Sequence, residues 1–184
     1  TRGELAHWIG PPMLESFQVN AGMTPEQARE AVNFYRTQGR AEGYAAGAQL
    51  YPGIGALIAD LAAAGIPQAT ASSKPENQVG TLLDHFELAP LFAAIVGATT
   101  DDVVATSTKE YVIGEALRRL EAAGVDTSRP VLVGDRHHDI DGAAEHGIPV
   151  VFVRWGFSWP HEAEGADAVV TTPDDLRALL LVEN

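Results

Sequence analysis

Cysteine is absent from the 184 residues, which excludes disulfide bonds and thiolate metal sites. Positive charge is scarce, since 12 Lys and Arg stand against 25 Asp and Glu and give a formal net charge of −13. A nucleic-acid-binding protein needs a basic face, so we do not expect nucleic acid as a partner. No apolar run approaches the length of a membrane span and no charged-then-apolar leader is present. We therefore expect no membrane partner and a cytoplasmic location.

The apolar content is sufficient for a packed core, because 46% of the residues are hydrophobic and the length suits one domain with a small insert. Residues 1–46 carry helical patterns only, interrupted at Gly10-Pro11-Pro12. The segment 24–43 begins with Thr24 in the N-cap position and Gln27 three residues later, which is typical of a helix start. We expect residues 1–46 to form a small helical domain.

Short apolar segments alternate with helical patterns across residues 47–184. Strands are predicted at 66–72, 93–98, 129–135, 148–156 and 166–171. Helices are predicted at 53–65, 75–86, 108–124, 138–147 and 172–183. This alternation predicts an α/β fold, with a Rossmann-like parallel sheet and helices on both faces. Ligands of such folds bind beyond the carboxyl ends of the strands.

Two of the predicted strand-to-helix junctions offer groups that suit an anion. Ser72 and Ser73 stand between a strand and a helix start, where hydroxyl and free N–H groups can hold a phosphate. Lys109 begins the long helix, although a cation there is unfavourable for the helix dipole. Taken alone, Ser72 and Ser73 can equally be ordinary capping serines, and Lys109 can be a solvated surface lysine.

The stretch "GDRHHDID" places several acidic residues directly after an apolar strand. Asp135 and Asp139 are four residues apart, so both carboxylates can face one point, and such hard oxygen ligands suit Mg²⁺. Asp139 and Asp141 can instead be acids that stabilise a helix N-terminus. His137 and His138 are adjacent, and without a third ligand nearby in sequence a histidine metal site is disfavoured.

A hydroxyl-bearing turn, a lysine and a carboxylate pair together suit phosphoryl transfer, in which catalysis is mostly positioning and charge neutralisation. Other phosphate signatures are missing. The sequence has no Walker loop, and Gly53-Ile54-Gly55 lacks the third glycine of a dinucleotide-binding turn.

The order of "ASSKP", Lys109 and "GDRHHD" resembles motifs two, three and four of the haloacid-dehalogenase-like hydrolases. The stretches "GPPMLESF", "YPGIGALIADLAAAG", "GDRHHDIDGAAEHGIPVVFVRWGF" and "GADAVV" resemble its phosphoglycolate-phosphatase-like branch, so the likeness covers nearly the whole chain. The resemblance implies a small helical cap over the site. It also implies that Ser72 binds the transferring phosphoryl group, with Lys109 pairing with that group and the nucleophile. Asp135 would be a Mg²⁺ ligand, and Asp139 would support the metal site.

One element of that family's pattern is missing. Its members attack phosphate with an aspartate in a D-x-D-G-T motif after the first strand, and this chain has none upstream of the helical segment. The stretch from Asp139 to Ala143, "DIDGA", imitates the motif, but polar residues rather than a strand precede it, so we interpret it as a helix start. We expect roughly 25–35 further residues, one βα unit, before Thr1.

We therefore expect a Mg²⁺-dependent phosphatase that hydrolyses a small phosphorylated metabolite through an aspartyl-phosphate. Gly10, Pro11 and Arg36 are candidate substrate contacts in the cap. A phosphosugar mutase and a catalytically dead homologue that acts by binding remain open. A metal-free dehalogenase is disfavoured by the acidic pair. A signalling receiver is disfavoured because its acidic pair comes first in the chain and its lysine last.

Overall fold

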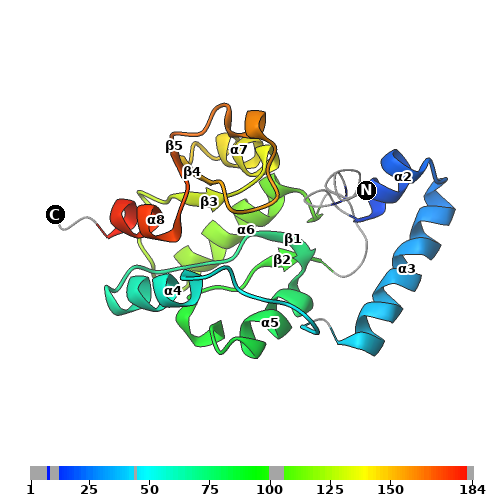
Figure 1. Cartoon of the computed structure of the whole chain (residues 1–184), viewed down its shortest axis with the longest axis horizontal. Coiled ribbons are helices and arrows are strands. Elements are labelled where there is room, and N and C mark those ends of the chain that lie inside the picture. Colours follow the sequence, from blue (N-terminus) through cyan, green and yellow to red (C-terminus); the bar gives the residue numbers. More distant parts are fainter. Residues whose placement is uncertain (1–7, 9–12, 44, 100–105, 182–184) are drawn as a thin grey trace.

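The computed structural model describes residue 8 and residues 13–43, 45–99 and 106–181. Helices and parallel strands alternate along the core (Figure 1), which confirms the predicted α/β fold. The helices are α2 (Met13–Ala21), α3 (Pro25–Glu42), α4 (Ile54–Ala63), α5 (Glu76–His85), α6 (Lys109–Ala122), α7 (His137–Ala144) and α8 (Pro173–Leu180), with short 3-10 turns at Ala89–Leu91 and Pro160–Ala163. The strands are β1 (Ser72–Pro75), β2 (Gly97–Ala98), β3 (Leu132–Gly134), β4 (Val150–Val153) and β5 (Ala168–Val170).

Helices α2 and α3 pack on each other at one side of the core, at the right of Figure 1. The start of α3 is the predicted one. The Thr24 hydroxyl accepts the Gln27 N–H at 3.3 Å, and the Gln27 side chain accepts the Thr24 N–H at 2.9 Å. This reciprocal capping satisfies two N–H groups that the helix itself leaves unpaired. The boundary of a helical domain near residue 46 stays a prediction.

The strands form two parallel sheets in the part of the chain that the structure describes, where the sequence predicted one. Strand β1 pairs with β2, and β4 lies between β3 and β5. Strands β3 and β4 pair in register from Leu132 opposite Val150 to Gly134 opposite Phe152. Within the described residues, β1 and β3 therefore each have a partner strand on one side alone.

The first predicted strand, 66–72, differs most from the structure, because the regular strand β1 begins only at Ser72. Its parallel pairing nevertheless extends back along the chain, through hydrogen bonds from Ala93 N–H to Gln68 O and from Thr70 N–H to Ala94 O. Pro75, placed in the first helical turn by the sequence, is instead the last residue of β1 and the N-cap of α5.

Alternate residues of β4 face opposite helical layers, as a strand buried on both faces requires. Val150 and Phe152 pack against Ile113 of α6 and against α7. Val151 and Val153 face the other way, into a cluster with α4 and α8 that contains Leu57, Leu61, Val170 and Leu176. Helices thus cover both faces, as predicted.

Helix α6 packs on both sheets. Ile113 belongs to the cluster around β4, whereas Val112 and Ala116 pack with Ala94 and Val96 beside β2. One helix therefore fixes the position of the first sheet relative to the second.

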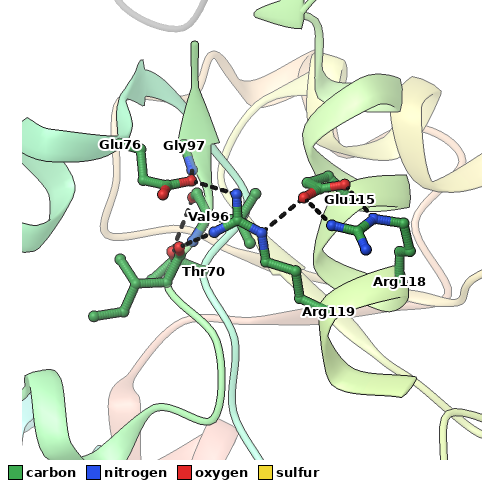
Figure 2. A network of polar contacts seen from close by, with 8 residues as sticks. Thr70, Glu76, Val96, Gly97, Glu115, Arg118 and Arg119 are labelled. Atoms are coloured by element: carbon green, nitrogen blue, oxygen red, sulfur yellow. Dashed lines mark hydrogen bonds and ion pairs between the residues drawn. The ribbon is translucent and has the colours of Figure 1, made fainter. Parts of the chain in front are cut away.

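A polar network ties the same helix to the first sheet (Figure 2). Arg119 of α6 pairs with Glu76 at 2.9 Å and with Glu115 at 2.7 Å, and it donates to Ile95 O at 3.0 Å. Hydrogen bonds from Arg118 and Arg119 lower the pKa of Glu115 from 4.5 to about 2. Because Glu76 follows β1 directly, this network fixes the turn that carries Ser72 and Ser73.

Candidate active site

Lys109 joins the residue just before β1 to the first turn of α7. Its Nζ donates to Ala71 O at 2.9 Å and pairs with Asp139 Oδ1 at 2.8 Å. The side chain is 21% exposed, so the cation is partly buried. Thr108 caps α6 by accepting the Tyr111 N–H, which places Lys109 in the first turn. The unfavourable helix dipole at this position is offset by the carboxylate of Asp139.

Asp139 is buried, and both of its carboxylate oxygens have protein donors. Oδ1 pairs with Lys109, while Oδ2 accepts the N–H groups of Asp135 and Arg136 at 3.1 and 3.0 Å. The "DIDGA" stretch is helical, as the sequence predicted. Asp139 therefore caps the start of α7 and at the same time holds Lys109 and the backbone of Asp135 in place.

Asp135 directly follows β3 at the carboxyl edge of the second sheet. Its Oδ2 accepts the Phe157 N–H at 2.6 Å, which leaves Oδ1 as the oxygen for a cation. A Cβ on Gly156 would clash with this carboxylate, so glycine is required there for the loop to approach. The Asp135 carboxylate, fixed by one N–H and only partly buried, has the hard-oxygen chemistry that Mg²⁺ prefers.

Ser72 and Ser73 lie in β1 and are half-buried. The Ser72 hydroxyl accepts the Lys74 N–H at 3.1 Å, which closes a tight turn before α5. Lys109 contacts the carbonyl oxygen of Ala71, the residue before Ser72, so its ammonium group lies near Ser72. The structure thus gathers Ser72, Lys109, Asp139 and Asp135 at one end of the core, although 38 residues separate Ala71 from Lys109.

One of the three cap candidates, Arg36, lies within the described residues. Gly10 and Pro11 lie outside the described residues. Arg36 belongs to α3, and that helix lies at the side of the core in Figure 1. Their contact with a substrate stays a prediction.

Arg136 and Glu162 form a buried pair that the sequence did not indicate. The guanidinium contacts the Glu162 carboxylate at 3.0–3.1 Å, and Glu162 also accepts the Trp159 N–H and contacts His137 Nδ1 at 2.7 Å. Burial alone would raise the pKa of Glu162, but the hydrogen bonds from Arg136, Trp159 and His137 outweigh it and lower the pKa from 4.5 to about 2. The pairing spans 26 residues, so no local pattern could have indicated it.

His138 is the next residue along α7 and is half-buried. Burial, together with the charges of His137 and Arg136, lowers its pKa below the ordinary value. It is therefore neutral at pH 7.

Gly142 explains why the DIDGA stretch carries a glycine inside a helix. A Cβ there would lie 2.7 Å from Lys109 Cβ and 2.9 Å from Glu110 N. Helices α6 and α7 therefore touch at Gly142, and this close approach sets the distance between Lys109 and Asp139. The local resemblance to a nucleophile motif arises from packing.

No helix in the described part of the chain is both long and apolar enough to cross a membrane.

Comparison with known proteins places these contacts in a family context. The family profile of the haloacid dehalogenase-like hydrolases matches residues 1–153. Tyrosine-protein kinase PtkA of Mycobacterium tuberculosis is 39% identical over 183 residues, which cover 97% of this chain and 60% of PtkA. The 5'-nucleotidase of Pseudomonas aeruginosa is 33% identical over 83% of this chain and 66% of its own length. The phosphoglycolate phosphatase of Caulobacter vibrioides is 33% identical over 65% of this chain and 49% of its own length.

A similar fold is known from a crystal structure described as a predicted phosphatase from Clostridium acetobutylicum. Its TM-score is 0.86 at 32% identity, over 98% of this chain and 82% of that one. The present chain spans 60% of the length of the PtkA relative that it matches.

Proposed function

Because the chain belongs to the haloacid dehalogenase-like hydrolases, of the phosphoglycolate-phosphatase-like branch, we propose that it acts as a Mg²⁺-dependent phosphatase on a small phosphate monoester. The observation that carries the proposal is the bridging position of Lys109. One ammonium group contacts the backbone beside Ser72 and the carboxylate of Asp139, which in turn holds Asp135. Lys109 thus connects Ser72, which we propose binds phosphate, with Asp135, which we propose binds Mg²⁺.

Each residue has a role that follows from its contacts. Ser72 and Ser73 offer hydroxyl groups to the oxygens of a bound phosphoryl group, and Lys109 offsets its negative charge. Asp135 would hold the Mg²⁺, while Asp139 positions both Asp135 and Lys109 rather than binding the ion with a free oxygen. When bound, Mg²⁺ would neutralise the charge that spreads over the transferring group.

The proposed reaction needs a carboxylate nucleophile, which would attack phosphorus, release the alcohol and form an aspartyl-phosphate that water then hydrolyses. We place this carboxylate at the end of a strand seated between β1 and β3. Both strands have partners on one side alone in the described residues. Val133 of β3 and Val131 just before it are 41% and 47% exposed. Such exposure is unusual for valines of a central strand, and it supports a further strand beside β3.

The test is Mg²⁺-dependent hydrolysis of p-nitrophenyl phosphate by the protein isolated from its own cells. We expect Asp135→Asn and Lys109→Ala each to lower kcat by roughly 10²-fold or more. Asp174→Asn is the matched control, because that side chain is 95% exposed on α8. Full activity in Asp135→Asn or Lys109→Ala would contradict the site assignment.

The intact mass of the same preparation tests the placement of the nucleophile. A mass a few kilodaltons above 19.5 kDa, with an aspartate in the additional segment, supports the inserted strand. A mass of 19.5 kDa without turnover supports the alternative of a homologue that acts by binding.

A second candidate is phosphoryl transfer to a protein tyrosine. The observation that favours it is the 39% identity with PtkA across 97% of this chain. Phosphate transfer from γ-labelled ATP to a tyrosine-containing polymer separates the two, since a phosphatase releases inorganic phosphate and labels no polymer. A phosphosugar mutase would instead convert one sugar phosphate into its isomer without net release.

A further inference from the structure

Two histidines and an aspartate gather on the exposed side of α7. His137, His138 and Asp141 each offer one ligand atom, and these three atoms all lie within 4.8 Å of one another. Asp141 follows His138 by three positions and His137 by four, which brings all three side chains to one face of the helix. The sequence disfavoured a histidine metal site for want of a third ligand, and Asp141 supplies it.

A buried carboxylate holds one of these histidines in the orientation that a metal ligand needs. Glu162, only 4% exposed, contacts His137 Nδ1 at 2.7 Å and is itself fixed by Arg136 and the Trp159 N–H. Because the carboxylate is an acceptor, His137 donates to it from Nδ1, and Nε2 is the ring nitrogen left for an ion. Metal-binding histidines commonly have this arrangement, in which the other ring nitrogen donates to a carboxylate.

The distances and the accessibility both permit a bound ion. Two ligands that bind one Zn²⁺ at about 2.0–2.1 Å lie at most about 4.2 Å apart, so small side-chain rotations bring the three atoms into range. The His137 side chain is 44% exposed and Asp141 is exposed, so an ion can enter from solvent.

The geometry points to a site for a divalent transition-metal ion of the Zn²⁺, Co²⁺ and Ni²⁺ class, with His137, His138 and Asp141 as ligands and Glu162 behind His137. Imidazole ligands select these ions over Mg²⁺. Three protein ligands leave at least one position for water or an incoming group. The three ligands are residues other than Asp135 and Lys109, and the inference stands whether or not the proposed phosphatase activity does.

The test is a titration of the untagged protein with Co²⁺ in the presence of excess Mg²⁺, which occupies the hard-oxygen site. Visible absorption of Co²⁺ reports nitrogen ligation, and added Zn²⁺ should displace the ion. We expect one Co²⁺ per chain. We expect His137→Ala, His138→Ala and Asp141→Asn each to weaken binding at least ten-fold.

Two controls separate this site from other ion binding. His85→Ala removes an exposed histidine of α5 and should leave affinity unchanged. Asp135→Asn should also leave it unchanged, because that carboxylate belongs to the other site. Absence of Co²⁺ binding, or wild-type affinity in any of the three ligand variants while circular dichroism shows them folded, would overturn the inference.

Discussion

Lys109 Nζ lies 2.8 Å from Asp139 Oδ1, and this contact joins the first turn of α6 to the first turn of α7. The same ammonium group reaches Ala71 O, directly before β1. A single cation therefore links three segments that are distant in sequence. Loss of this cation should lower the stability of the fold as well as the rate of catalysis.

Replacing Lys109 with alanine should lower the free energy of unfolding by roughly 2 kcal/mol, because the buried carboxylate of Asp139 loses its charged partner. Arg118 of the same helix is 64% exposed, and Arg118→Ala should change stability much less. Urea unfolding monitored by circular dichroism measures both. Equal stabilities of the two variants would show that the Lys109–Asp139 contact contributes nothing.

Adding one methyl group at Gly142 should destabilise the protein by about 1–3 kcal/mol, because a Cβ there would push α6 away from α7. Gly80 is the matched control, since it lies inside α5 with nothing within 4 Å of its Cβ position. Gly80→Ala should stabilise the protein by up to about 1 kcal/mol, as alanine favours helices. Thermal melts of the two variants should therefore shift in opposite directions.

Low pH should lower the free energy of unfolding, because Glu162 becomes protonated. Its pKa is about 2 in the folded state against 4.5 for the free group. The folded pKa is the lower one, so this stabilisation is complete above pH 4.5 and is lost as the pH falls toward 2. The full difference corresponds to about 3 kcal/mol.

Glu162→Gln should destabilise the protein at pH 7 and flatten the decline of stability below pH 4.5, because the titrating group is gone. Glu164→Gln, an exposed change two residues away, should keep the decline. Urea midpoints measured from pH 7 to pH 3 give the comparison, and an unchanged slope in Glu162→Gln would exclude this carboxyl as its cause.

Arg119, whose contacts Figure 2 shows, should stabilise the fold more than Arg118, the preceding residue of α6. Arg119→Ala removes contacts with Glu76, Glu115 and Ile95 O, and we expect a loss of about 1–2 kcal/mol. Arg118 is 64% exposed and contacts Glu115 within one helix turn, so Arg118→Ala should lower stability less than Arg119→Ala does. Differential scanning calorimetry resolves the two, and a larger loss for Arg118→Ala would contradict this ranking.

Local patterns predicted the elements well where local physics decides them. The capping box of Thr24 and Gln27 is present as expected, because it depends on side chains three residues apart. Strand 66–72 was predicted less well. Its regular part begins only at Ser72, since strand regularity depends on pairing with distant segments.

The candidate site shows the same division. The position of Asp135 at a strand end was evident from the apolar run before it, whereas Ser72, expected at a strand end, is the first residue of β1. The contact between Lys109 and Asp139 and the pair of Arg136 and Glu162 were not, because they join segments about 26–30 residues apart with no shared period. The third ligand beside His137 became evident only when the helix register was known.

Helix α6 has a consequence for how the core opens. Since Val112 and Ile113 are adjacent in the chain but belong to clusters on different sheets, neither sheet can lose its cover without exposing the other. Amide protons in β2 and β4 should therefore exchange with solvent through one shared opening event rather than through two independent ones. The core shared by the two sheets would open as a single cooperative unit, and the amide protons in the middle of α6 would exchange most slowly.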